Sequence, residues 1–210
     1  MRIGIDARMI FMSGIGTYLR NLLGGLASLD EDIEYTVFIQ TDDRERFEPP
    51  GGNFSPSFVS APPYSISEQV GFVRRIEGSG LDLIHHPHYA APVFGRVPMV
   101  ATIHDLIHQL FPELCPSRLA WQVSRMLARR TAGRAKLLLT VSEHSRSDII
   151  NHLRASPGKV RLTYNALPPD WGKSLSPEPP PGIGAEVPFF LYVGNHKEHK
   201  NSSRSKRYWL

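Results

Sequence analysis

Short apolar runs alternate with amphipathic helical patterns along residues 1–164, and this alternation constrains the fold more than any other feature of the sequence. The apolar runs predict strands at 2–6, 35–39, 58–59, 81–85, 97–103, 136–141 and 160–164. The helical patterns lie at 18–26, 65–76, 116–133 and 142–153. Strands and helices that alternate at this spacing predict an α/β domain with a mostly parallel sheet and helices on both faces.

The distribution of proline predicts where this domain ends. Residues 168–187 are dense in proline, which suits a stiff connection between domains. We therefore expect one domain over 1–167, a linker over 168–187, and the first strand of a second domain within 188–210. That strand, FFLYVG at 189–194, has no sheet partners in the remaining sequence, so we expect the chain to be the front half of a two-domain protein.

The last nine residues, after Asn201, lack the apolar spacing of a helix and are polar and basic. A shifted reading frame is the favoured interpretation of this tail, and a natural short product remains open.

Composition and charge exclude several classes of protein. The chain is 41% apolar and 21% charged, as ordinary globular proteins are, and its single cysteine cannot form an internal disulfide. No apolar run approaches the roughly 18 to 20 residues that cross a bilayer, and no secretory signal is recognisable, so a cytoplasmic protein is predicted. Part of the net charge of +4 lies in the last few residues, so a nucleic-acid partner is not expected.

Glycines follow the first predicted strand, at a point where a parallel sheet binds ligands. Gly14 and Gly16 stand just before the helical pattern that begins near Tyr18. They would let the backbone approach a ligand closely and offer N–H groups to an anion. A tight turn before a helix explains the same spacing, so both interpretations stay open. Ser142 likewise opens a predicted helix, and capping is the favoured role for it.

Histidines stand at the ends of the predicted strands 81–85 and 97–103, with His85, His86 and His88 at the first and His104 and His108 after the second. Two interpretations compete. A metal site would need three or four of these side chains in a fixed geometry. Alternatively, His104 is a hydrogen-bonding residue held in one orientation by a neighbour such as Asp105.

Taken in order, these segments resemble the N-terminal, acceptor-side half of a GT-B glycosyltransferase of family 4, a group of retaining hexosyl and mannosyl transferases. The resemblance covers residues 1–201. The segments that carry it are 3–8 (IGIDAR), 14–18 (GIGTY), 84–92, 102–106 (TIHDL), 140–145 (TVSEHS), 160–165 and 192–201. It implies a Rossmann-like domain that forms the first half of a GT-B fold.

The resemblance implies transfer of a hexose, for example mannose, from a nucleotide-sugar to a glycan or lipid-linked acceptor with retention and without a metal or other cofactor. It places His104 and Asp105 at the catalytic centre. Gly14, Gly16 and Lys200 would contact the donor phosphates, while Arg8, His85 and Tyr89 would line the acceptor side. Most of the nucleotide site would lie in the second domain, so this chain alone is expected to be inactive.

The sequence departs from the family where arginine often follows the strand at 189–194, because Asn195, His196 and His199 stand there instead. Two other functions stay open. One is a non-catalytic module that binds an acceptor or partner, in which the arginines of helix 116–133 contact anionic lipid at the inner face of the membrane. The other is a histidine-rich, metal-dependent hydrolase.

Overall fold

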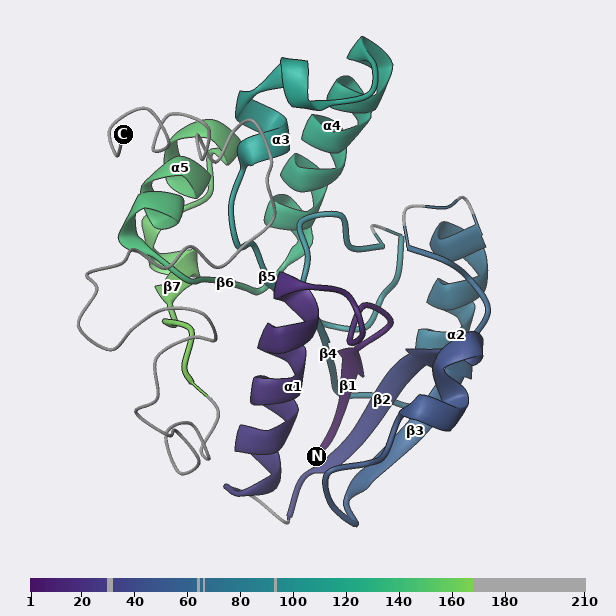
Figure 1. Cartoon of the computed structure of the whole chain (residues 1–210). Helices are drawn as coiled ribbons and strands as arrows, with labels where there is room; N and C mark the ends of the chain where they lie inside the picture. The colour runs from purple at the N-terminus through teal and green to yellow at the C-terminus, as the bar shows by residue number, and fades with distance from the viewer. Residues whose placement is uncertain (30–31, 64, 66, 93, 168–210) are drawn as a thin grey trace, which may run out of the picture. The chain divides into compact units, whose positions relative to one another are not determined.

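Seven strands form one sheet in the part of the chain that the structure describes (Figure 1). The structure is a computed structural model, and it describes residues 1–167 except 30, 31, 64, 66 and 93. The strands are β1 (Arg2–Asp6), β2 (Glu34–Gln40), β3 (Phe54–Val59), β4 (Leu83–His86), β5 (Met99–Thr102), β6 (Leu137–Thr140) and β7 (Val160–Leu162). Their order is β3-β2-β1-β4-β5-β6-β7 and every neighbouring pair is parallel, which confirms the predicted fold.

Helices cover both faces of this sheet. They are α1 (Gly14–Ala27), α2 (Val73–Glu77), α3 (Ile107–Leu110), α4 (Arg118–Arg134) and α5 (Glu143–Leu153), with the shorter turns η1 (Thr41–Arg46), η2 (Glu68–Phe72), η3 (Pro112–Leu114) and η4 (Pro157–Lys159). Strand side chains point to alternate faces, so Val37 joins a core cluster with α1, while Phe38 joins one with η2, α4 and α5. None of the described helices combines the length and apolar composition needed to cross a membrane.

Contacts divide the chain into two units, Met1–Pro168 and Pro169–Leu210. The predicted linker at 168–187 and the predicted strand within 188–210 lie outside the described residues, so both stay predictions.

Two segments differ from the expectations drawn from the sequence. Strand β3 is longer than the predicted pair 58–59. The sequence predicts too short a strand because Pro56 and its neighbouring serines interrupt the apolar pattern. Pro56 is tolerated because β3 lies at the edge of the sheet. The helix predicted at 65–76 is present, but its first part, η2, is a π-helix and only the short α2 that follows it is α-helical. Glu68 of this turn is 2% exposed, so the turn directs a carboxylate into the protein.

The sequence predicts that Gly14 and Gly16 lie in a loop before the helix. In the structure both residues belong to the first turn of α1. A Cβ atom on Gly16 would collide with the backbone carbonyl of Ile10, whereas nothing lies within 4 Å of one on Gly14. Arg20 donates from Nη1 to the same Ile10 oxygen at 2.6 Å. Gly16 is therefore required by the close packing of α1 against the segment after β1.

A buried ionic network holds the end of β1 against β4 and η2. Arg8 donates from Nε and Nη2 to the two carboxylate oxygens of Asp6 at 2.8 Å each, and Nη2 also contacts Glu68 Oε1. His86 Nδ1 lies 3.0 Å from Asp6 Oδ2, and the Phe72 ring lies 3.8 Å from the guanidinium. Burial opposes ionisation of Asp6, but the charge and hydrogen bonds of Arg8 outweigh it and hold the Asp6 pKa far below its ordinary value.

Two basic side chains fasten the C-terminal end of α4 to its surroundings. Arg134 donates to the backbone carbonyls of Pro92, Gly95 and Val97 at 2.6 to 3.0 Å and so holds the connection between β4 and β5. Lys159, directly before β7, donates from Nζ to Ala132 O at 2.6 Å and to Gly133 O at 2.9 Å. A cation at this end of a helix binds carbonyls that lack helical partners and complements the helix dipole.

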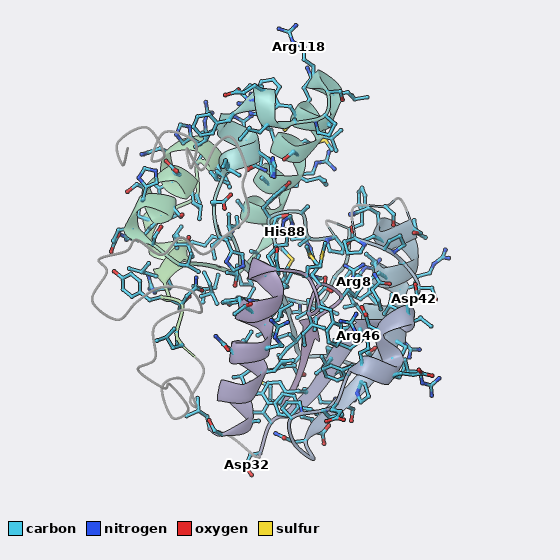
Figure 2. The ribbon with its side chains drawn as sticks, viewed as in Figure 1. Arg8, Asp32, Asp42, Arg46, His88 and Arg118 are labelled. Carbon is cyan, nitrogen blue, oxygen red and sulfur yellow. The ribbon has the colours of Figure 1, made fainter. Side chains whose placement is uncertain are left out.

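The buried network predicts a large loss of stability when its cation is removed. Arg8→Met should lower the free energy of unfolding by about 3 to 5 kcal/mol, because two carboxylates would remain buried without a cation. Arg46→Met is the matched control, since Arg46 pairs with Asp43 at 2.9 Å but its side chain is 61% exposed (Figure 2). The control should lose about 1 kcal/mol or less. Urea denaturation measures both, and similar losses would contradict the structural role of Arg8.

Candidate functional site

A pocket of about 770 Å³ opens between the N-terminal half of α1 and the carboxyl ends of β5, β6 and β7. Ligands of α/β proteins bind at the carboxyl ends of the strands of a parallel sheet. The residues that line the pocket are Gly14, Ile15, Thr17, Tyr18, Asn21 and Leu22 of α1, His104 and Asp105 after β5, Leu139 and Val141 at β6, and Thr163, Tyr164, Asn165 and Ala166 after β7.

The N-terminus of α1 presents backbone N–H groups at one wall of this pocket. Thr17 N donates to Ser13 O at 3.1 Å as the first helical bond, so the amides of residues 14–16 precede the helical ladder. Ser13 makes no side-chain capping bond, and the first turn contains no acidic residue. Together with the helix dipole, these amides form a site suited to an anion such as phosphate.

His104 brings an unsatisfied ring nitrogen to the same pocket. Its Nε2 atom is buried and has no hydrogen-bond partner among the described residues. The ring also bonds to the backbone of Pro87, and because proline has no N–H, the Pro87 carbonyl accepts from His104 Nδ1. Burial lowers the pKa of His104, against the opposing effects of this bond and of Asp105. His104 is therefore neutral near pH 7, with Nε2 able to accept a hydrogen bond from a ligand hydroxyl.

A chain of side-chain hydrogen bonds fixes the wall against which His104 packs. The Tyr18 ring meets the His104 ring edge to face, with centroids 4.8 Å apart. The Tyr18 hydroxyl lies 3.0 Å from Thr102 Oγ1, which in turn lies 2.7 Å from His85 Nε2. These bonds join α1, β5 and β4. Tyr18 is thereby held in place, and it restricts the orientation of the His104 ring.

Of the other residues predicted for the donor and catalytic site, Asp105 lines the pocket and Gly16 lies in the same helical turn as Gly14. The sequence suggested Asp105 as the neighbour that orients His104. The Asp105 carboxylate instead accepts from Ile107 N at 3.1 Å at the start of α3, and the hydrogen bond to the His104 ring comes from the Pro87 carbonyl. Lys200 lies outside the described residues. The functions predicted for all of these residues stay predictions.

The three residues predicted for the acceptor side do not line this pocket. Arg8 is 4% exposed, within the ionic network (Figure 2). His85 is buried, and its Nε2 atom lies 2.7 Å from Thr102 Oγ1. The Tyr89 hydroxyl accepts from Ser124 of α4 at 3.3 Å. Their acceptor-side functions stay predictions, and the described contacts of Arg8 and His85 serve to hold other side chains.

The sequence did not single out Tyr18, Asn21 or residues 163–166 as parts of a site. Tyr18 begins the helical pattern at 18–26, where its ring fits the apolar side of that pattern, and no periodic pattern marks the segment after β7. Tyr164 lines the pocket although it is 71% exposed, so its ring is available to a ligand. Within the described ranges, no group of three or more His, Cys, Asp or Glu side chains could hold a metal ion.

Residues 12–171 match the family model for Glycosyltransferase Family 4. No curated protein matches the sequence. Among solved structures, Anabaena HepE in complex with UDP and glucose is similar over 80% of this chain, with a TM-score of 0.51 and 19% identity. A glycosyltransferase from Rickettsia africae is similar over 84%, with a TM-score of 0.51 and 11% identity. This chain spans under half the length of both proteins, 45% and 46% respectively.

Sucrose-phosphate synthase from Thermosynechococcus elongatus is similar over 79% of this chain and 90% of its own, with a TM-score of 0.54 and 15% identity. At these identities the three structures demonstrate a shared fold.

The packing of His104 predicts how its ring should respond to substitution of Tyr18. Tyr18→Phe keeps the ring contact and should leave the low His104 pKa unchanged. Tyr18→Leu removes the aromatic wall and admits water, so the His104 pKa should rise toward its ordinary value of about 6.5. Ring ¹⁵N NMR titration of His104 measures this value together with the tautomer. An unchanged pKa in the Tyr18→Leu variant would show that Tyr18 does not shield His104.

His85 predicts a dependence of stability on pH. Burial, with smaller effects from His86 and His104, lowers the pKa of His85 to about 4, against about 6.5 when unfolded. Between these values only the unfolded chain binds the proton, so stability is full above pH 6.5 and falls as the pH drops toward 4. The slope contributed by His85 should be about 1.4 kcal/mol per pH unit.

Urea denaturation at a series of pH values measures this slope. His85→Gln should reduce it by that amount, whereas His144→Gln, at a side chain that is 89% exposed, should leave it unchanged. Equal slopes in the wild-type protein and His85→Gln would rule out His85 as the source.

Proposed function

The chain belongs to glycosyltransferase family 4, and from this premise we propose that it takes part in transfer of a hexose, for example mannose, from a nucleotide-sugar to a glycan or lipid-linked acceptor, with retention. The observation that carries the proposal is the pairing of two recognition groups in one pocket. The amides at the start of α1 suit a phosphate, and the unsatisfied His104 Nε2 suits a sugar hydroxyl. A nucleotide-sugar carries both groups next to each other.

Similar proteins support this choice of ligand. HepE was solved in complex with UDP and glucose, so a protein of this fold binds the two components of such a donor. The family match supports a transferase, and we propose by this analogy that the donor of the present chain is also a nucleotide-sugar.

The described residues have distinct functions in the proposed reaction. When the bond between the anomeric carbon and the phosphate oxygen breaks, negative charge grows on the departing diphosphate. The oriented amides of residues 14–16 stabilise this charge without having to reorganise. His104, held by Pro87 and Tyr18, orients the sugar so that the anomeric carbon faces the acceptor. Lys200 is proposed to add a positive charge near the phosphates, and no metal is required for these steps.

The proposed donor and acceptor also bear on location. Nucleotide-sugars are consumed on the cytoplasmic side in the reactions that the resemblance implies, so we propose a cytoplasmic protein. A lipid-linked acceptor would bring it to the inner face of the membrane.

NMR titration tests the proposed donor site with UDP, UDP-glucose and GDP-mannose as probes. UDP and at least one nucleotide-sugar should shift the amide signals of residues 14–17, and only a nucleotide-sugar should shift the His104 ring. His104→Ala should weaken nucleotide-sugar binding about five-fold, as expected for one hydrogen bond, and leave UDP binding unchanged. His144→Ala is the exposed control. Signal changes confined to other parts of the chain would refute the site.

A further inference from the structure

Helix α4 exposes three of its larger apolar side chains to solvent. Leu119 is 68% exposed, Val123 41% and Met126 44%, and their spacing of four and three residues places them on one face. Phe111, in the connection before η3, is 48% exposed. We call residues 107–130 the α3–α4 tip. Figure 1 shows α3 and α4 extending past the sheet, and Figure 2 shows Arg118 at the end of α4 farthest from it.

The fully buried side chains of α4 are small. Ala128, Thr131 and Ala132 are the buried residues of this helix. An ordinary surface helix turns its large apolar residues toward the core and its polar residues outward. Over the first three turns of α4, Trp121 packs against α3 but Leu119, Val123 and Met126 face solvent, so packing within the described domain does not account for these three side chains.

Positive charge runs beside this apolar stripe. At helical spacing, Arg118, Arg125 and Arg129 fall along one flank of the stripe and Arg130 falls at its C-terminal end. Helix α4 contains no acidic residue. The α3–α4 tip, residues 107–130, contains four arginines and one acidic residue, Glu113, so its net charge is +3.

The helix presents these side chains from a firm base. Ser117 Oγ caps it by accepting from Ala120 N at 3.1 Å, and Trp121 Nε1 donates to Gln109 O at 3.1 Å. The Arg125 guanidinium lies 4.7 Å from the Trp121 ring. The first turns are therefore fixed to α3, and the apolar and basic stripes form one surface before any partner is bound.

We propose that the α3–α4 tip docks on an anionic lipid bilayer. Leu119, Val123 and Met126 enter the boundary between headgroups and acyl chains, with Phe111 beside them. The arginines keep their guanidinium groups among the lipid phosphates while their stems cover apolar surface. An extended anionic surface complements both stripes at once, since it offers apolar depth and negative charge along the whole helix. This inference deepens the proposed use of a lipid-linked acceptor, but its observations are independent of the pocket.

Vesicle pelleting with the full chain tests the proposal. The probes are vesicles of phosphatidylcholine alone and of phosphatidylcholine mixed with phosphatidylglycerol, each at low and high salt. The chain should pellet with the anionic vesicles, and binding should weaken with salt. The triple variant Arg118→Gln, Arg125→Gln, Arg129→Gln should bind at least about ten-fold more weakly, since each arginine near an anionic surface contributes roughly a five-fold factor.

Two further variants separate charge placement from total charge. Arg44→Gln, Arg74→Gln, Arg161→Gln removes the same charge from other exposed positions and should bind nearly as the unchanged chain does. Leu119→Ser, Val123→Ser, Met126→Ser keeps every charge and should lose the binding that persists at high salt. Circular dichroism and thermal unfolding verify that each variant is folded.

Equal pelleting with neutral and anionic vesicles, no pelleting with either, or equal losses in the two arginine variants would overturn the proposal. Neither donor nor acceptor is present in this experiment, so its failure would leave the proposed glycosyl transfer standing. Failure of the nucleotide-sugar titration would likewise leave the docking surface standing.

Discussion

Parallel pairing of the seven described strands is the constraint on which the other features of the domain depend. Because every strand runs the same way, the segments that follow β1, β4, β5, β6 and β7 all begin on the side of the sheet formed by the carboxyl ends of the strands. This arrangement brings the start of α1, His104 and residues 163–166 to one pocket although they are distant in sequence. The ionic network also lies at the carboxyl end of β1, where Arg8 connects the segment after β1 to Glu68 of η2.

Much of the fold could be predicted because buried parallel strands are nearly continuous apolar runs, as at 81–85 and 136–141. Prediction was weakest where local composition and tertiary packing disagree. Pro56 concealed an edge strand, and two glycines made the first turn of α1 look like a loop. Position 16 requires glycine because α1 packs tightly against the Ile10 carbonyl, and no local pattern in the sequence reveals that contact.

The candidate site was predictable only in part, for a related reason. His104 and Gly14 could be found because they follow strands, and strand ends converge in a sheet of this type. Tyr18 could not, since one aromatic residue in an apolar helical stripe resembles a core residue until its hydroxyl is seen beside Thr102. The Pro87 carbonyl that orients His104 belongs to the backbone, and a backbone contact leaves no trace in the identity of a residue.

The contacts of Lys159 connect two regions that otherwise look separate. Its ammonium group donates to the carbonyls of Ala132 and Gly133 at the C-terminal end of α4. Strand β7 ends three residues after Lys159, and the next residue, Thr163, lines the pocket. The short segment from Lys159 to Thr163, which contains β7, therefore connects the C-terminal end of α4 to the rim of the pocket. A displacement of the C-terminal end of α4 would therefore pass through Lys159 and the short β7 to the segment that lines the pocket, where Thr163 N donates to Thr140 O and Asn21 Nδ2 donates to Ala166 O.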